Sequence, residues 1–158
     1  MSRLPFQVLV IPFRIREQFE VAIFKREKKT GGCWQCIAGG GEANESPIDA
    51  ARREAQEEAG IPTTSQFNKL DTISSIPRIH FPDAKWAKDI FVIPEYCFAV
   101  KTENHEIRLS NEHTEYKWVN LEEALKLLKW DSNKTAVWEL FCRTQKEAFS
   151  PFLSLTKS

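Results

Sequence analysis

Two runs of apolar residues near the start of the chain have the length and composition of β-strands. Residues 6–13 and 19–24 are rich in Val, Ile and Phe, and the polar segment 14–18 separates them. This pattern predicts a β-hairpin. Residues 34–38 form a further short strand candidate, and it leads into the three glycines 39–41, which indicate a loop.

The segment after the glycines carries the marks of a helix with defined ends. Ser46 suits the N-cap, Pro47 suits the first helical position, and Asp49 stands at the third, which is the spacing of a capping box. Gly60, followed by Pro62, is expected to end the helix.

The second half of the chain predicts further strands and two helices. The strand candidates are residues 69–76, 90–101 and 115–119. Pro94 interrupts the second of these, so we expect a bulge or a sheet edge there. The two helices are expected to begin at Asn120 and near Ser132. Strands mixed with three helices predict an α/β (α+β) fold, with a mixed β-sheet between helices.

The first predicted helix has an apolar stripe and an acidic patch. Its stripe consists of Ile48, Ala51, Ala55 and Ala59. Because most of these residues are alanine, we expect the helix to lie close against the sheet. Glu54 and Glu58 flank the stripe, and Glu57 lies just beyond it. Arg53 can neutralise one of these glutamates, most simply Glu57 at i+4.

Three features of this acidic patch disfavour the helix on its own. Glu54 and Glu58 form a like-charge i,i+4 pair, all three carboxylates lie against the helix dipole, and two of them border the buried stripe. A site that violates local preference is a candidate functional site, and a divalent cation such as Mg²⁺ or Mn²⁺ would remove the conflict. The alternative is a solvated acidic helix face without a ligand.

Length and charge limit the classes of function. The chain has 158 residues, which fits a single domain over residues 1–158. Lys and Arg number 22, as do Asp and Glu, so no overall positive field is present to hold nucleic acid or an anionic membrane. The apolar run 8–13 is too short to span a bilayer. We therefore expect a cytoplasmic protein in which local groups or a metal would hold any anionic substrate.

A spaced motif joins the glycine loop to the acidic helix. Gly39 is followed by five residues, Glu45, seven residues, and then the run Arg53-Glu54-Ala55-Gln56-Glu57-Glu58-Ala59-Gly60-Ile61. This resembles the Nudix box, Gly-x5-Glu-x7-Arg-Glu-U-x-Glu-Glu-x-Gly-U, in which U is a bulky aliphatic residue. All seven fixed positions match. Ala55 is smaller than the residue usual at its position, which bears on packing rather than on chemistry.

Segments outside the box resemble one Nudix branch. They are residues 33–40, residues 111–118, Trp130 and the pair Ser132-Asn133. The branch contains dihydroneopterin triphosphate diphosphatases and proteins labelled dATP pyrophosphohydrolases. The resemblance implies a Nudix-type α/β/α sandwich that hydrolyses a phosphoanhydride bond with Mg²⁺, or with Mn²⁺.

The resemblance also implies roles for individual residues. It assigns metal coordination to the Gly39 carbonyl and to the carboxylates of Glu54, Glu57, Glu58 and Glu112. Either Glu54 or Glu112 can serve as the base, and the sequence does not decide between them. Arg53 is expected to orient a carboxylate by a charge-assisted pair.

The substrate is expected to contact residues outside the acidic patch. Arg26, or its neighbour Lys25, can hold a phosphate oxygen, and the alternative for both is a solvated strand end. Trp34 and Phe81 are candidates for stacking on a flat base, as is Trp86, and their alternative is packing. Asn133 resembles a family asparagine that reads a base edge, with a helix N-terminal position as its alternative. A full list of the predicted substrate-binding residues is Arg26, Trp34, Phe81 and Asn133.

These observations predict an Mg²⁺-dependent pyrophosphohydrolase. Its substrate would be a nucleoside triphosphate or dihydroneopterin triphosphate, cut to the monophosphate and pyrophosphate. One alternative is hydrolysis of ADP-ribose or a nucleotide sugar, since Pro77 follows Ile61 by 16 residues, near the spacing of a proline marker in ADP-ribose-cleaving members. Another is a non-catalytic Nudix domain that binds nucleotides.

Overall fold

The two apolar runs near the start of the chain form the predicted hairpin. In the computed structural model, which describes residues 3–102 and 106–145, β1 (Gln7–Ile15) and β2 (Phe19–Arg26) pair antiparallel. β1 also pairs parallel with β6 (Val92–Lys101) and antiparallel with β4 (Ile37–Gly40). β1 is therefore the centre of a mixed sheet.

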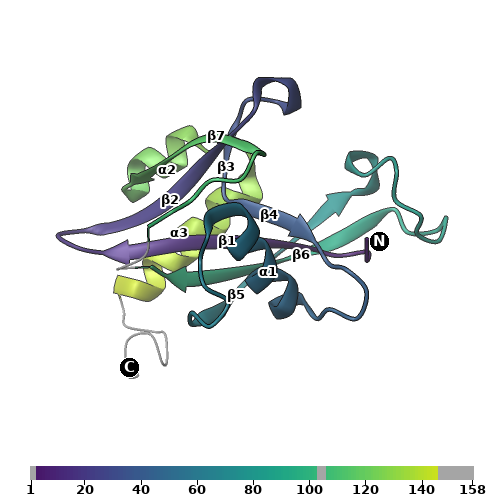
Figure 1. The fold of residues 1–158 in the computed structure, drawn as a ribbon, viewed down its shortest axis with the longest axis horizontal. Coiled ribbons are helices and arrows are strands. Elements are labelled where there is room, and N and C mark those ends of the chain that lie inside the picture. Colours follow the sequence, from purple (N-terminus) through teal and green to yellow (C-terminus); the bar gives the residue numbers. More distant parts are fainter. Residues whose placement is uncertain (1–2, 103–105, 146–158) are drawn as a thin grey trace.

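The remaining strands complete a seven-stranded sheet within the described part of the chain. β5 (Phe67–Pro77) pairs antiparallel with β6, while β3 (Trp34–Gln35) and β7 (His113–Val119) both pair antiparallel with β2. Two short 3-10 turns, Lys28–Thr30 and Arg78–His80, lie in the connections. Figure 1 shows the resulting order of elements.

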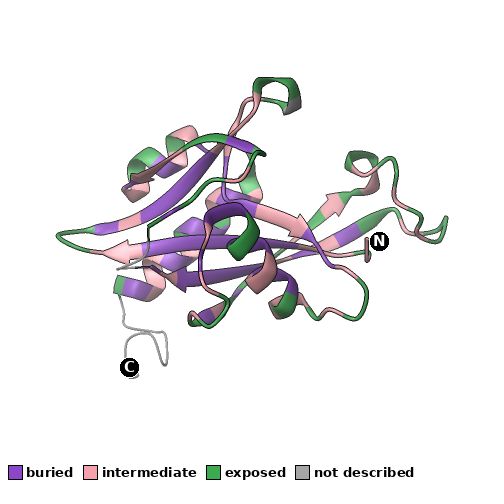
Figure 2. Cartoon of the chain, in the orientation of Figure 1, coloured by how far each residue is buried: buried purple, intermediate pink, exposed green. Residues whose placement is uncertain are grey.

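Helices cover both faces of the sheet, as the sequence predicts (Figure 1). Along β1, Val8 and Val10 pack with the alanines of α1 (Pro47–Ala59), whereas Leu9 and Ile11 pack toward α2 (Leu121–Leu127) and α3 (Asp131–Gln145). Successive strand residues point to opposite faces, so one apolar strand serves two cores. β1, β2 and β6 are buried along most of their length, and the turn that joins β1 to β2 is exposed (Figure 2).

The glycine segment differs from the predicted loop. Gly39 and Gly40 belong to β4, where they pair with Val8 and Gln7. The predicted strand over residues 34–38 is divided at Cys36, because β3 pairs with β2 while β4 pairs with β1.

Pro94 lies near the start of β6, where that strand is paired on one side only, rather than at a bulge. It pairs with Ser75 of β5, while the pairing of β6 with β1 begins one residue later, at Glu95. The missing N–H of proline therefore costs no bond to β1. The register shift between β5 and β6 falls instead between Lys69 and Ile73.

Among the described residues, no helix has both the length and the apolar character needed to cross a bilayer.

Candidate active site

Local sequence fixes the position of the acidic helix. The Ser46 side chain accepts from the Asp49 N–H, and the Asp49 carboxylate accepts from the Ser46 N–H, so the predicted capping box is present. Gly60 ends α1 with φ of 71°, in the left-handed region that favours glycine. Ala51 and Ala55 are fully buried against the sheet. The short alanine side chains bring the carboxylates beside them close to β4.

Glu54 lies directly against the backbone of β4. A Cβ atom added to Gly39 would stand 2.0 Å from Oε2 of Glu54, so this approach requires a glycine. Glu54 is 9% exposed. Burial raises the pKa of its carboxyl to about 7, since the nearby Arg53 only partly offsets burial and the charges of Glu57 and Glu58 raise the pKa further.

A second group of side chains surrounds Glu58 at the end of α1. Glu58 is 4% exposed, accepts a hydrogen bond from the Ser110 hydroxyl, and has its Oε1 3.4 Å from Nδ1 of His113. Burial acts to raise the pKa of Glu58, but the contacts with His113 and Ser110 outweigh it and lower the pKa. Burial and then the charge of Glu58 raise the pKa of Glu112. The carboxyl groups of Glu58 and Glu112 are thus partly buried and close enough for each to affect the pKa of the other.

Arg53 ties the helix to the glycine strand. Its Nε donates to Oε2 of Glu45 at 2.7 Å, and its Nη2 donates to the Gly40 carbonyl at 2.8 Å. Its Nη1 lies 3.2 Å from carboxylate oxygens of both Glu54 and Glu57. The sequence favours Glu57 as the main partner of Arg53. In the structure the shortest contact of Arg53 is with Glu45, because the segment before α1 places the Glu45 carboxylate against the guanidinium. Arg53 orients several carboxylates at once.

The donor set suits a hard divalent cation. Glu54 lies against Gly39, the charges of Glu57 and Glu58 act on Glu54, and that of Glu58 acts on Glu112; oxygen ligands are those that Mg²⁺ and Mn²⁺ prefer. Within residues 3–102 and 106–145, no three acidic, histidine or cysteine side chains converge closely enough to hold a metal ion as they stand, so binding would require the carboxylates to draw together. Burial raises the pKa of Glu54 more than Arg53 lowers it, so a cation beside this carboxylate would stabilise its charged form. The residues present fit such a cation in type and in charge.

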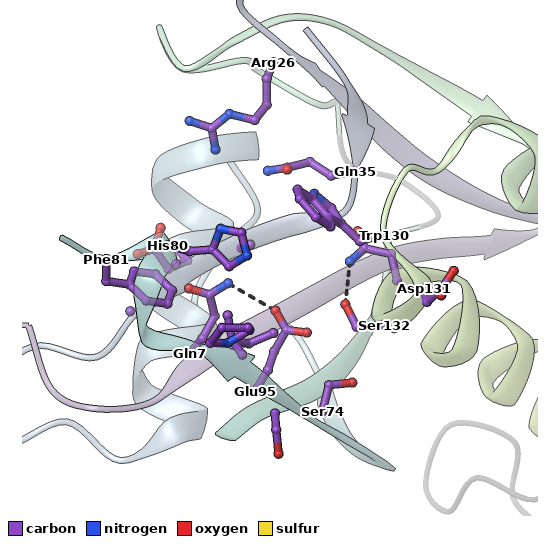
Figure 3. A pocket seen from close by; sticks show the side chains of 18 of the residues that line it. Gln7, Arg26, Gln35, Ser74, His80, Phe81, Glu95, Trp130, Asp131 and Ser132 are labelled. Carbon is purple, nitrogen blue, oxygen red and sulfur yellow. Dashed lines mark hydrogen bonds between the residues drawn. The ribbon is translucent and has the colours of Figure 1, made fainter. Parts of the chain in front are cut away.

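A cavity of about 720 Å³ extends away from these carboxylates. Gly39, Glu54 and Glu112 line it, as does Arg26. Figure 3 shows Arg26 on one side of the cavity, with Ser74 and Glu95 on the other. Its volume is in the range that holds a small-molecule ligand.

The predicted substrate-binding residues divide into two groups. Arg26, Phe81 and Asn133 line the cavity. Trp34 is not among the residues that line it, and the Nζ atom of Lys117 lies 5.2 Å from the centre of its ring. Trp86 does not line the cavity either. Its indole N–H donates to the Arg3 carbonyl at 2.7 Å, which anchors the loop that carries it.

Asn133 has a structural contact of its own. Its Oδ1 accepts from the Cys36 N–H at 2.8 Å, at the point where the chain passes from β3 to β4. Its Nδ2 donates to the Ser132 hydroxyl at 3.2 Å. Asn133 is 3% exposed. The side chain therefore holds α3 against the strands as well as lining the cavity.

Several cavity residues are missing from the sequence-based prediction. Gln7 and Glu95 line the cavity, and Nε2 of Gln7 donates to Oε2 of Glu95 at 3.1 Å. His80 and Trp130 also line it, with ring centres 5.8 Å apart in an edge-to-face arrangement. One sequence feature marks Glu95, because it is the single carboxylate within an otherwise apolar strand, residues 92–100.

Comparison with known proteins gives concordant results. Residues 4–140 match the family model for the NUDIX domain. The chain is 36% identical over 107 residues to the asymmetrical bis(5'-nucleosyl)-tetraphosphatase of Sus scrofa, which covers 67% of this chain and 68% of that protein. It is 30% identical over 107 residues to the dihydroneopterin triphosphate diphosphatase of Haemophilus influenzae, and the match covers 66% of this chain and 68% of that protein. The crystal structure of a NUDIX hydrolase from Listeria monocytogenes superposes with a TM-score of 0.81 and 41% identity, over 90% of this chain and 95% of that one.

Proposed function

The chain belongs to the NUDIX family of hydrolases that act on phosphoanhydride bonds, and on that premise we propose a substrate, a cofactor and roles for residues. The substrate is a nucleoside triphosphate or dihydroneopterin triphosphate, which the protein cuts to the monophosphate and pyrophosphate. The observation that carries the proposal is the group of carboxylates on α1 and at Glu112, two of which, Glu54 and Glu112, line a cavity large enough for the rest of the substrate.

Mg²⁺ is the proposed cofactor, with Mn²⁺ as a substitute. The Gly39 carbonyl and the carboxylates of Glu54, Glu57, Glu58 and Glu112 would hold it. When bound, such a cation shields the charge of the phosphates and lowers the pKa of a water molecule.

The protein's own groups supply orientation and a proton acceptor. Arg53 fixes the Glu54 carboxylate relative to the Gly40 carbonyl, and Arg26 lies in the same cavity to bind a phosphate oxygen. Glu54 and Glu112 are both candidates to accept the proton of the attacking water. Burial raises the pKa of each, which brings the carboxylates closer to the pH at which a general base works best.

A second candidate substrate is a dinucleoside tetraphosphate. The identity of 36% with the tetraphosphatase of Sus scrofa favours it. It requires the same carboxylates but a longer polyphosphate, so the products distinguish it from the first proposal.

Product analysis tests the proposal directly. Purified protein is incubated with Mg²⁺ and, separately, dGTP, dATP, dihydroneopterin triphosphate, Ap4A and ADP-ribose, and the products are separated by anion-exchange chromatography. We expect monophosphate and pyrophosphate from a triphosphate. A Glu57→Gln variant serves as the matched inactive protein, and exposed Glu122→Gln as the control. Preference for Ap4A or ADP-ribose would replace the proposed substrate, and absence of turnover on every compound would contradict the proposal.

A further inference from the structure

A buried carboxylate lies in the cavity away from the acidic helix. Glu95 of β6 is 2% exposed and lines the cavity together with its neighbours in the sheet. It pairs with Gln7 of β1 on one side and with Ser74 of β5 on the other. These three polar residues form one row across three adjacent strands, and all of them line the cavity (Figure 3). The proposed hydrolysis makes no use of this row.

The contacts of Glu95 leave part of its hydrogen-bonding capacity unused. Oε2 accepts from Nε2 of Gln7, while Oε1 has no hydrogen-bond partner among the described residues. The Gln7 amide is held in this orientation from its other end, since its Oε1 accepts from the Arg3 guanidinium. Burial raises the pKa of Glu95, and the nearby Gln7 and Ser132 side chains act against that shift. An acceptor buried without a partner is costly, so a donor from a ligand would stabilise it.

Flat side chains line the same cavity as this acceptor. The rings of His80 and Trp130 meet edge to face, and Figure 3 shows both on the same side of Glu95. Trp130 is 39% exposed, so its ring is accessible to a ligand. An aromatic wall next to a fixed carboxylate is suited to a planar heterocycle that donates hydrogen bonds from its edge.

We propose that Glu95 is a specificity-determining residue, which binds a heterocycle that presents two adjacent N–H donors, the 2-amino-4-oxopyrimidine ring common to guanine and pterin. A carboxylate is an acceptor only: the unpartnered Oε1 can take one donor of the pair, and Oε2, which accepts one hydrogen bond from Gln7, has a second lone pair for the other. Adenine presents a donor beside a ring nitrogen that is an acceptor, and this nitrogen faces a carboxylate oxygen unfavourably. The inference rests on the proposed function, in that it names the base of the triphosphate.

Binding of monophosphates separates base recognition from hydrolysis. Dissociation constants for GMP, IMP and AMP are measured by calorimetry in EDTA, where the phosphate is the same and only the base differs. We expect GMP to bind about tenfold or more tightly than AMP, with IMP between them because it lacks the 2-amino group. Equal binding of GMP and AMP by the wild-type protein would overturn the inference, and this comparison needs no variant.

The variant Glu95→Gln, which has nearly the same shape as the wild type, provides a second test of the inference. Glu95→Gln replaces one acceptor by a donor, so we expect the preference for GMP over AMP to fall by about tenfold or more. Glu139→Gln is the matched control, because Glu139 is a partly buried, hydrogen-bonded carboxylate that lies outside the cavity, against β5. Retention of the full GMP preference by Glu95→Gln would contradict the inference.

A fourth ligand distinguishes a pterin from guanine as the ring that Glu95 binds. 7,8-Dihydroneopterin, which carries the same donor edge, is titrated in the same way as GMP, and tighter binding of one of them assigns the ring to a pterin or to guanine. If GMP is preferred but no triphosphate is hydrolysed, the inference stands and the proposed function fails. If triphosphates are hydrolysed without any preference for this edge, the proposed function stands and the inference fails.

Discussion

Replacing Glu54 by glutamine should stabilise the protein in the absence of metal, and only at high pH. The carboxyl has a pKa of about 7 in the folded protein, against 4.5 as its ordinary value, chiefly because it is buried against Gly39. This shift corresponds to about 3 kcal/mol of unfavourable free energy for the charged form. Glutamine has nearly the same shape as glutamate but carries no charge, so the substitution removes this penalty with little change in packing.

The raised pKa of Glu54 determines how the stability of the protein changes with pH. Between pH 4.5 and 7 the folded protein binds a proton at Glu54 that the unfolded chain has lost, so the stability of the wild type falls as pH rises through this window. Above pH 7 the full penalty is present. The Glu54→Gln variant has no such penalty. We therefore expect the free energy of unfolding of the variant, relative to the wild type, to rise by about 3 kcal/mol between pH 4.5 and pH 8.

Urea unfolding in EDTA at pH 4.5, 6 and 8 measures this difference. Glu122→Gln is the control, because its side chain is 80% exposed on α2 and its removal should leave stability nearly unchanged at every pH. Addition of Mg²⁺ at pH 8 should stabilise the wild type by mass action and the Glu54→Gln variant much less. A stability difference between variant and wild type that is independent of pH would refute the reasoning.

Three further predictions concern other residues. Gly39→Ala should lower hydrolysis by about 100-fold or more in kcat, because the new Cβ displaces the Glu54 carboxylate, and steady-state kinetics will measure it. Glu57→Gln should reduce turnover by a similar factor of about 100 while its thermal unfolding midpoint in EDTA falls by no more than about 2 °C from the wild type. Asn133→Ala should destabilise the protein by about 1–3 kcal/mol in urea unfolding, since the buried Cys36 N–H loses its acceptor; an unchanged unfolding midpoint would show that the contact is dispensable.

Features set by neighbouring residues could be predicted from the sequence. The capping residues of α1, from Ser46 to Asp49, and its end at Gly60 depend on backbone groups within a few positions. The hairpin of β1 and β2 requires only a short polar turn between two apolar runs. The alanine stripe of α1 likewise predicted its close approach to the sheet.

Features that depend on distant pairing could not be predicted. Gln7 and Glu95 meet only because β1 and β6 pair in parallel, and no local pattern specifies that register. Residues 34–40 divide into two strands because β3 pairs with β2 and β4 with β1, and the Cys36 N–H between them is satisfied by Asn133, 97 residues away. Trp34 appeared as a stacking candidate because its residue type suits that role, but its position outside the cavity lining is a consequence of how β3 pairs with β2.

Binding of Mn²⁺ tests most directly the claim that the carboxylates of α1 hold a divalent cation. Electron paramagnetic resonance of free Mn²⁺ is recorded during titration with the wild-type protein, with Glu57→Gln, and with Glu122→Gln as the surface control. The account predicts that the wild type and Glu122→Gln take up Mn²⁺ equally, that Mg²⁺ competes, and that Glu57→Gln binds about tenfold or more weakly. An unchanged signal with the wild type, or equal uptake by Glu57→Gln, would contradict it.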